Sequence, residues 1–146
     1  ALREAGVPLD PQIVRHGNWN ADTGYALSKE LLTLDDPPSA LFCGNDRMAV
    51  GAYFAILELG LSIGGDVSVL GYDNQTELAQ FAHPPLASVE LHYYRMGYLG
   101  AHILLGDAPS SRNMVSCQLM LRQSVGRIKP TTEEPAAYSW FSARHD

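Results

Sequence analysis

Residues 38–52 have the sequence PSALFCGNDRMAVGA, in which an apolar run ends at a glycine and a helical pattern follows. Residues 40–43 are continuously apolar, as expected for a strand that is covered on both faces. After the turn, apolar residues recur at helical spacing and form an inward stripe of Ala49, Ala52, Tyr53, Ile56 and Leu59. The stretch therefore predicts a strand, a sharp turn at residues 44–46 and a long helix.

The same alternation of strand and helix extends in both directions. The predicted strands are residues 12–16, 40–43, 67–70, 87–89 and 116–122. A helix capped by Asn20 or Asp22 follows the first of them, and a helix over residues 95–105 has Met96, Leu99 and Ile103 on one face. Such alternation is typical of βαβ units, so the predicted fold class is α/β, a Rossmann-like lobe with a parallel sheet between helix layers.

Composition and charge exclude several classes of protein. The 146 residues are 46% hydrophobic and 18% charged, which is typical of one globular domain. The net charge is −6 and the ten Lys and Arg are scattered, so the chain alone is not expected to bind DNA. It has no apolar run of about 20 residues and no signal pattern, so we expect a soluble cytoplasmic protein. Cys43 and Cys117 lack metal-type spacing and are expected to be buried thiols.

Polar or aromatic residues follow three of the predicted strands, each time after a glycine. The stretches are Gly17-Asn18-Trp19, Gly44-Asn45-Asp46 and Gly71-Tyr72-Asp73. Ligands of open parallel sheets bind beyond the carboxyl ends of the strands, so we expect Trp19, Asn45 and Asp73 to line one crevice, with Asn18 beside them. A sugar suits this set, because its hydroxyls can bond to the amide and carboxylate while its C–H face lies on the indole. A purine or another flat polar ligand could use the same groups.

Structural roles explain several of the same residues. Asp46 directly precedes the long helix and is expected to be its N-cap. Asn45 and Asp73 could be turn residues whose side chains bond their own backbone, and Trp19 could fill the core. Turns alone would not require a glycine followed by polar or aromatic residues after all three strands. The recurrence of this pattern therefore favours a ligand site.

No catalytic motif is present. The chain has no G-x-S-x-G, phosphate loop, H-E-x-x-H or C-x-x-C, and its five histidines are not at ligand spacing on any one element. We therefore predict no catalytic residues, no metal site and no cofactor, and an enzyme is not expected.

Residues 38–52 and 64–74, at this separation, closely resemble the core of LacI/GalR repressors. Residues 85–89, 95–97 and 121–125 continue the likeness, which extends to about Arg127. By position, Trp19 matches the family's aromatic that stacks on the effector, Asn45 its polar contact and Asp73 the acid of its G-Y-D turn. There are two departures. Leu91 stands where many members have Gln, and Asn18 stands where the turn often has Asp. Both bear on which effector fits.

The resemblance also implies a domain organisation. The family has a periplasmic-binding-protein-like core of two lobes with the effector between them, preceded by a DNA-binding head. Residues 1–127 would form the C-terminal lobe, except that residues 87–106 would belong to the other lobe, and residues 128–146 would form a weakly structured tail. DNA contact would need a head before residue 1. Homodimers would form through a patch of Met48, Val50, Leu78 and Phe81.

The function implied is an effector-binding and dimerisation module of a LacI-type repressor, with a sugar as the effector. The alternative is a periplasmic sugar-binding protein of a transport system, because both classes share this fold and differ in what is attached to it.

Overall fold

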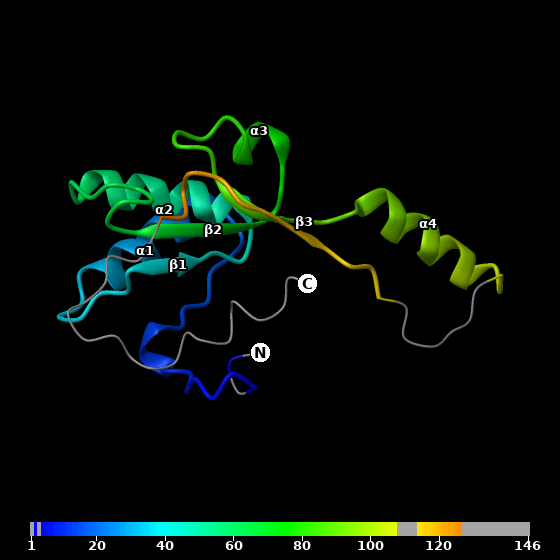
Figure 1. The fold of residues 1–146 in the computed structure, drawn as a ribbon, viewed down its shortest axis with the longest axis horizontal. Coiled ribbons are helices and arrows are strands. Elements are labelled where there is room, and N and C mark those ends of the chain that lie inside the picture. Colours follow the sequence, from blue (N-terminus) through cyan, green and yellow to red (C-terminus); the bar gives the residue numbers. More distant parts are fainter. Residues whose placement is uncertain (1, 3, 108–113, 127–146) are drawn as a thin grey trace, which may run out of the picture.

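A mostly parallel four-stranded sheet forms the centre of the molecule (Figure 1). The computed structural model describes residues 2, 4–107 and 114–126. The strands are β1 (Ala40–Phe42), β2 (Ser68–Asp73), β3 (Ala87–Glu90) and β4 (Gln118–Met120), and they lie in this order. The first three are parallel and β4 is antiparallel to β3. The predicted α/β class is thereby confirmed.

Helices follow most strands. They are the 3₁₀ helix η1 (Pro11–Ile13) and the α-helices α1 (Ala21–Leu32), α2 (Asp46–Glu58), α3 (Thr76–Ala79) and α4 (Tyr93–Leu104). The inward stripe predicted for α2 is confirmed, since Ala49, Ala52, Tyr53 and Ile56 are buried, although Leu59 is only partly so. Among the described helices, none has the length and hydropathy needed to cross a membrane.

The backbones of α1 and α2 approach each other directly at two glycines. A Cβ atom added to Gly51 would lie 2.0 Å from the Ala21 carbonyl oxygen, and one added to Gly24 would lie 2.3 Å from the Met48 carbonyl oxygen. Real Cβ atoms do not come this close to backbone atoms. Only glycine at these positions allows the two helices to pack as they do.

The predicted strand at residues 12–16 is wrong. Pro11–Ile13 form a 3₁₀ turn instead, and the Asp10 carboxylate accepts a hydrogen bond of 2.8 Å from the Gln12 amide at its start. A cavity of about 370 Å³ is lined both by Leu9, Ile13 and Val14 and by all three residues of β1. The segment therefore does not pair with the edge of the sheet, and its local Asp-Pro turn determines its conformation.

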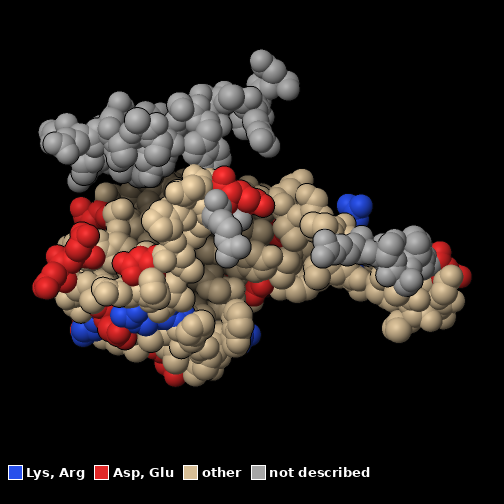
Figure 2. Space-filling model, turned by 90° about the horizontal axis from the view of Figure 1, so that it is seen from below, with Lys and Arg blue, Asp and Glu red and all other residues tan. Residues whose placement is uncertain are grey.

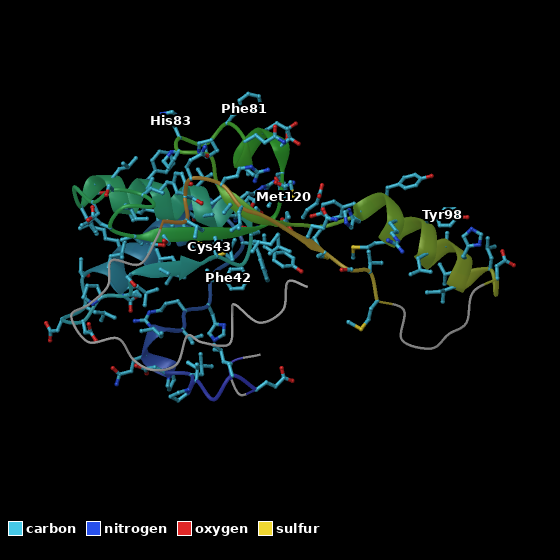
Figure 3. The ribbon with its side chains drawn as sticks, in the orientation of Figure 1. Phe42, Cys43, Phe81, His83, Tyr98 and Met120 are labelled. Atoms are coloured by element: carbon cyan, nitrogen blue, oxygen red, sulfur yellow. The ribbon has the colours of Figure 1, made fainter. Side chains whose placement is uncertain are left out.

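One face of β1 is left uncovered by the described residues. Leu41 and Cys43 are buried, whereas Phe42 between them is 69% exposed (Figure 3). The prediction that both faces of this strand are covered is therefore wrong for the described part of the chain. The apolar run satisfied the pattern of a central strand, but α2 packs against one side only.

Helix α4 stands apart from the rest of the molecule, to which β3 and β4 connect it (Figure 1). None of its residues is buried, and Tyr94 and Tyr98 are largely exposed. Residues 87–90 form β3 within the sheet, and only α4 stands apart, so the expectation that residues 87–106 belong to another lobe stays a prediction. The expected tail, residues 128–146, lies outside the described residues.

The two cysteines differ in burial and should differ in reactivity. Cys43 is buried, and burial, with a smaller contribution from the Asp46 charge, raises its pKa to about 12. Cys117 is only partly buried, so the expectation of two buried thiols holds fully for Cys43 alone. Because the thiolate is the nucleophile, a disulfide reagent at pH 8 is expected to modify Cys117 at least about 100-fold faster than Cys43.

The measurement is mass-spectrometric mapping of the labelled thiol over time, repeated in urea, where both should react. Cys117→Ser should remove the fast phase. A native protein whose Cys43 reacts as fast as Cys117 would contradict this assignment.

Candidate functional site

The carboxyl ends of β1, β2 and β3 meet at one edge of the sheet. Phe42 at the end of β1 lies opposite Leu70, and Asp73 at the end of β2 lies opposite Glu90 of β3. Asn45 follows β1 by three residues, so the parallel register places Asn45 and Asp73 at the same edge on neighbouring strands. The structure thus brings together two of the predicted ligand residues.

Trp19 lies beside Asn45, although the predicted strand before it is absent. Its backbone carbonyl accepts a hydrogen bond of 3.0 Å from Asn45 Nδ2. Its ring packs over Gly44, where an added Cβ would lie 3.0 Å from a ring carbon. The side chain is 63% exposed, so Trp19 does not fill the core. Its ring offers an open apolar face next to the amide of Asn45.

Asn18 fixes the turn that presents Trp19. Its Oδ1 accepts hydrogen bonds from the Thr23 hydroxyl at 2.7 Å and from the Asn20 amide at 3.1 Å. Trp19 itself has a φ of 70°, a conformation that few residues other than glycine adopt. The bonds of Asn18 to the start of α1 hold this backbone in place, so its structural role is visible and its ligand role stays a prediction.

Asn45 is the N-cap of α2. Its Oδ1 accepts a hydrogen bond of 2.9 Å from the Met48 amide, while its Nδ2 bonds to Trp19. One lone pair and one N–H of an amide remain for a ligand after these two bonds. The structural reading that assigned Asn45 to its own turn is therefore correct, and it leaves hydrogen-bonding capacity at the site.

Asp46 is not the N-cap, contrary to the sequence prediction. It is the first residue of α2 and is fully buried, with its carboxylate directed to groups far along the chain. Oδ1 accepts from the Ser88 hydroxyl at 2.6 Å and Oδ2 from the Gln75 amide at 2.7 Å. Burial raises the pKa of Asp46, and these two hydrogen bonds partly oppose that rise. No local sequence pattern indicates partners this distant along the chain.

Asp73 occupies a left-handed turn at the end of β2. Its φ is 104°, and its Oδ2 accepts a hydrogen bond of 3.1 Å from Gln75 Nε2. The hydroxyl of Tyr93 lies close by: burial, followed by the charge of Asp73 and a hydrogen bond with it, raises the pKa of Tyr93. Tyr93 is a further candidate residue for the site, which the sequence analysis missed. It follows β3 just as the other candidates follow their strands, which was the available signal.

An apolar cavity of about 360 Å³ adjoins this edge of the sheet. It is lined by Tyr72, Leu91, Met96, Leu99, Gly100, Ile103, Val115 and Cys117, so it lies between the strand ends and α4. Leu91, noted above as a departure from the family pattern, is part of its wall. Trp19, Asn45 and Asp73 are not among its lining residues, so the cavity is an apolar hollow apart from the candidate polar groups. The described residues include no cluster of three His, Cys, Asp or Glu that could hold a metal ion.

The four residues of the predicted dimer patch differ in exposure. Phe81 is 79% exposed in the loop after α3 (Figure 3), whereas Val50 and Leu78 are half-buried. Met48 packs against the core and against Gly17 and Gly24, and it lines the cavity beside β1. The exposed part of the patch is thus Phe81 with its surroundings, and the interface role of all four residues stays a prediction.

Comparison with known families and structures is consistent with this geometry. Residues 1–125 match the family model described as a periplasmic binding protein-like domain. The chain belongs to the effector-binding domains of LacI-family regulators. It is 34% identical over 129 residues to the HTH-type transcriptional repressor CytR of Escherichia coli strain K12, an alignment that covers 85% of this chain and 38% of that protein. The chain therefore spans about two fifths of the length of this relative.

Solved structures of LacI-family regulators superpose on this chain. The lac repressor dimer bound to operator and the anti-inducer ONPF superposes with a TM-score of 0.75 at 26% identity, over 86% of this chain and 44% of that one. The complex of the transcriptional regulator CelR with cellobiose superposes with a TM-score of 0.73 at 31% identity, over 84% of this chain and 39% of that one. These relatives are transcription regulators and not enzymes, which confirms that expectation.

Proposed function

We propose that the chain is the effector-binding part of a cytoplasmic LacI-type repressor and that its effector is a sugar. The observation behind this proposal is the juxtaposition of Trp19, Asn45 and Asp73 at one sheet edge. The open ring of Trp19 supplies a stacking face, while Asn45 and Asp73 supply hydrogen-bonding groups for hydroxyls. The cellobiose bound to the related CelR supports a sugar as the class of effector.

The scattered positions of the basic residues support the proposal that a separate head, and not this chain, contacts DNA. Figure 2 shows Lys and Arg at separate places on the face in view, with acidic residues near several of them. The net charge of −6 also disfavours direct contact with a phosphate backbone. Effector binding would act on DNA affinity by linkage, since a ligand that prefers one arrangement of the two lobes shifts the whole protein toward it.

The test is calorimetric titration of the natural protein that contains this chain with cellobiose, ribose, cytidine and hypoxanthine. We expect micromolar affinity for at least one saccharide and an altered affinity for operator DNA in its presence. Trp19→Ala should weaken saccharide binding by at least about tenfold, because the stacking face is lost. The 146-residue chain alone is expected to bind weakly or not at all, since it supplies one side of the site. No binding by any of the four compounds, or binding of the purine alone, would count against the sugar assignment.

We also propose that the chain associates as a homodimer through the patch that contains Phe81. An exposed phenyl ring beside partly exposed apolar residues is typical of interfaces, and truncating such a ring removes a large share of the binding energy. Phe81→Asp is expected to raise the dimer dissociation constant by about thirtyfold in sedimentation equilibrium. Phe54→Asp, at an exposed phenylalanine outside the patch, is the matched control. Equal effects of both substitutions, or a wild-type monomer at high concentration, would contradict the proposal.

A further inference from the structure

The turn that follows β2 has an unfavourable backbone conformation. Asp73 has a φ of 104° and Asn74 a φ of 51°, both in the left-handed region although neither residue is glycine. Two such residues in succession cost free energy, and they persist only where the surroundings hold them in place. We refer to residues 73–75 as the Asp73 turn.

Two consecutive amides of the Asp73 turn are held by side chains from other elements. The Asn74 amide donates to Ser88 Oγ at 3.0 Å, and the Gln75 amide donates to Asp46 Oδ2 at 2.7 Å. Ser88 in turn donates to Asp46 Oδ1 at 2.6 Å, which joins the two acceptors. Both side chains are fully buried. An added Cβ on Gly71 would lie 2.3 Å from Asp46 Oδ1, so the carboxylate sits directly against the backbone of β2.

A third side chain holds the turn from the opposite strand. Arg122, which follows β4, donates through one nitrogen to Asn74 Oδ1 at 2.8 Å and through another to the Leu86 carbonyl at 2.6 Å. Asn74 is therefore bound at its backbone by Ser88 and at its side chain by Arg122. The charge on the guanidinium strengthens these bonds relative to neutral ones.

We infer that Asp46, Ser88 and Arg122 are positioning residues that hold the Asp73 turn so that the Asp73 carboxylate faces the site. None of them is needed at the ligand for this role, and each acts on the backbone or side chain next to Asp73. The inference rests on the proposed function only in taking Asp73 to bind the effector. The hold on the turn itself can be measured without a ligand.

The experiment is amide hydrogen exchange of the 146-residue chain by NMR, with attention to Asn74 and Gln75. Ser88→Val removes the hydroxyl and adds a methyl group, and Ser88→Thr has the same shape as valine but keeps a hydroxyl. We expect the Asn74 amide to exchange at least about fivefold faster relative to the amides of α2, the change that corresponds to one lost hydrogen bond of roughly 1 kcal/mol. Ser88→Thr, which restores the hydroxyl, should return the exchange rate toward that of the wild type.

The matched control is Ser124→Val. Ser124 is also fully buried, and it also makes two hydrogen bonds, from the Ala87 amide and to the Val69 carbonyl. Its loss should lower stability throughout without a selective effect on Asn74. No selective acceleration in Ser88→Val, or equal acceleration in Ser124→Val, would overturn the inference.

A second variant keeps the test decisive if Ser88→Val does not fold. Arg122→Gln changes a side chain that is only partly buried, and it should shift the Asn74 side-chain amide resonance and speed backbone exchange at Asn74. Unchanged spectra and exchange in this variant would also overturn the inference. A natural protein that binds none of the four titrated compounds would remove the proposed function and leave the exchange result standing.

Discussion

Alanine in place of Gly51 is expected to unfold the chain or to lower its free energy of unfolding by at least about 3 kcal/mol. The added methyl would lie 2.0 Å from the Ala21 carbonyl oxygen and 2.6 Å from the Tyr25 amide nitrogen. Both are backbone atoms of α1, so no side-chain rotation can relieve the overlap. The two helices would have to separate, although α2 is also fixed to the sheet. Since domains are stable by only about 5–15 kcal/mol, urea denaturation followed by circular dichroism should detect the loss easily.

Gly97→Ala is the matched control for this prediction. Gly97 lies in α4, and nothing lies within 4 Å of an added Cβ there. Alanine is the better helix former by up to about 1 kcal/mol, so this variant should be as stable as the wild type or slightly more stable. A Gly51→Ala protein within about 0.5 kcal/mol of the wild type would show that α1 and α2 do not pack as closely as described.

Local sequence patterns predicted helices and strands well where the apolar face of the element packs in the core. The stripe of α2 was predicted from helical spacing, and the same residues form the core against β2. The closeness of α1 to α2 was not predictable. Gly24 and Gly51 stand inside helices, where glycine usually only weakens the structure, and nothing local shows that another backbone passes beside them.

The two errors of the fold prediction have one physical origin. A strand is stabilised by hydrogen bonds to a neighbouring strand, and among the described residues none pairs with residues 12–16, so the β-forming Ile13 and Val14 do not make this segment a strand. In the same way, an apolar run such as residues 40–43 predicts cover on both faces but cannot supply it, and Phe42 remains exposed. Both outcomes depend on what lies across space from the segment, and periodicity contains no information on that.

The site was predictable to the extent that topology determines it. Parallel strands bring their carboxyl ends together, so the sequence predicts that Asn45 and Asp73 lie at one edge of the sheet, and the strand register agrees, while their ligand role stays a prediction. The role of Asp46 was not predictable. Helix α2 begins one residue earlier than the capping pattern implied, so Asn45 took the cap and Asp46 turned inward. Its partners Gln75 and Ser88 lie 29 and 42 residues along the chain.

The charge of Asp73 should matter most for effector binding. Asp73→Asn keeps the size of the side chain, and asparagine tolerates a positive φ, so the turn should persist. A carboxylate that bonds a ligand hydroxyl contributes about 1.5–3 kcal/mol, so affinity for the tightest-binding of the four titrated compounds should fall by about 10- to 100-fold. The free energy of unfolding should change by less than about 1 kcal/mol. Calorimetry and urea denaturation of the natural protein that contains this chain measure the two quantities.

Glu90→Gln is the control that shows whether the loss of binding depends on the position of the removed negative charge or only on the total negative charge near the site. Glu90 lies opposite Asp73 at the end of β3, and both side chains are half-buried, so the two variants remove the same charge from neighbouring strands. If Asp73 bonds the effector directly, its substitution alone should weaken binding strongly, and the salt dependence of the loss should be small. Equal losses in both variants would instead indicate a general effect of negative potential, because exposed or half-exposed charges act over about a Debye length without contact. That outcome would remove Asp73 from the ligand-binding residues.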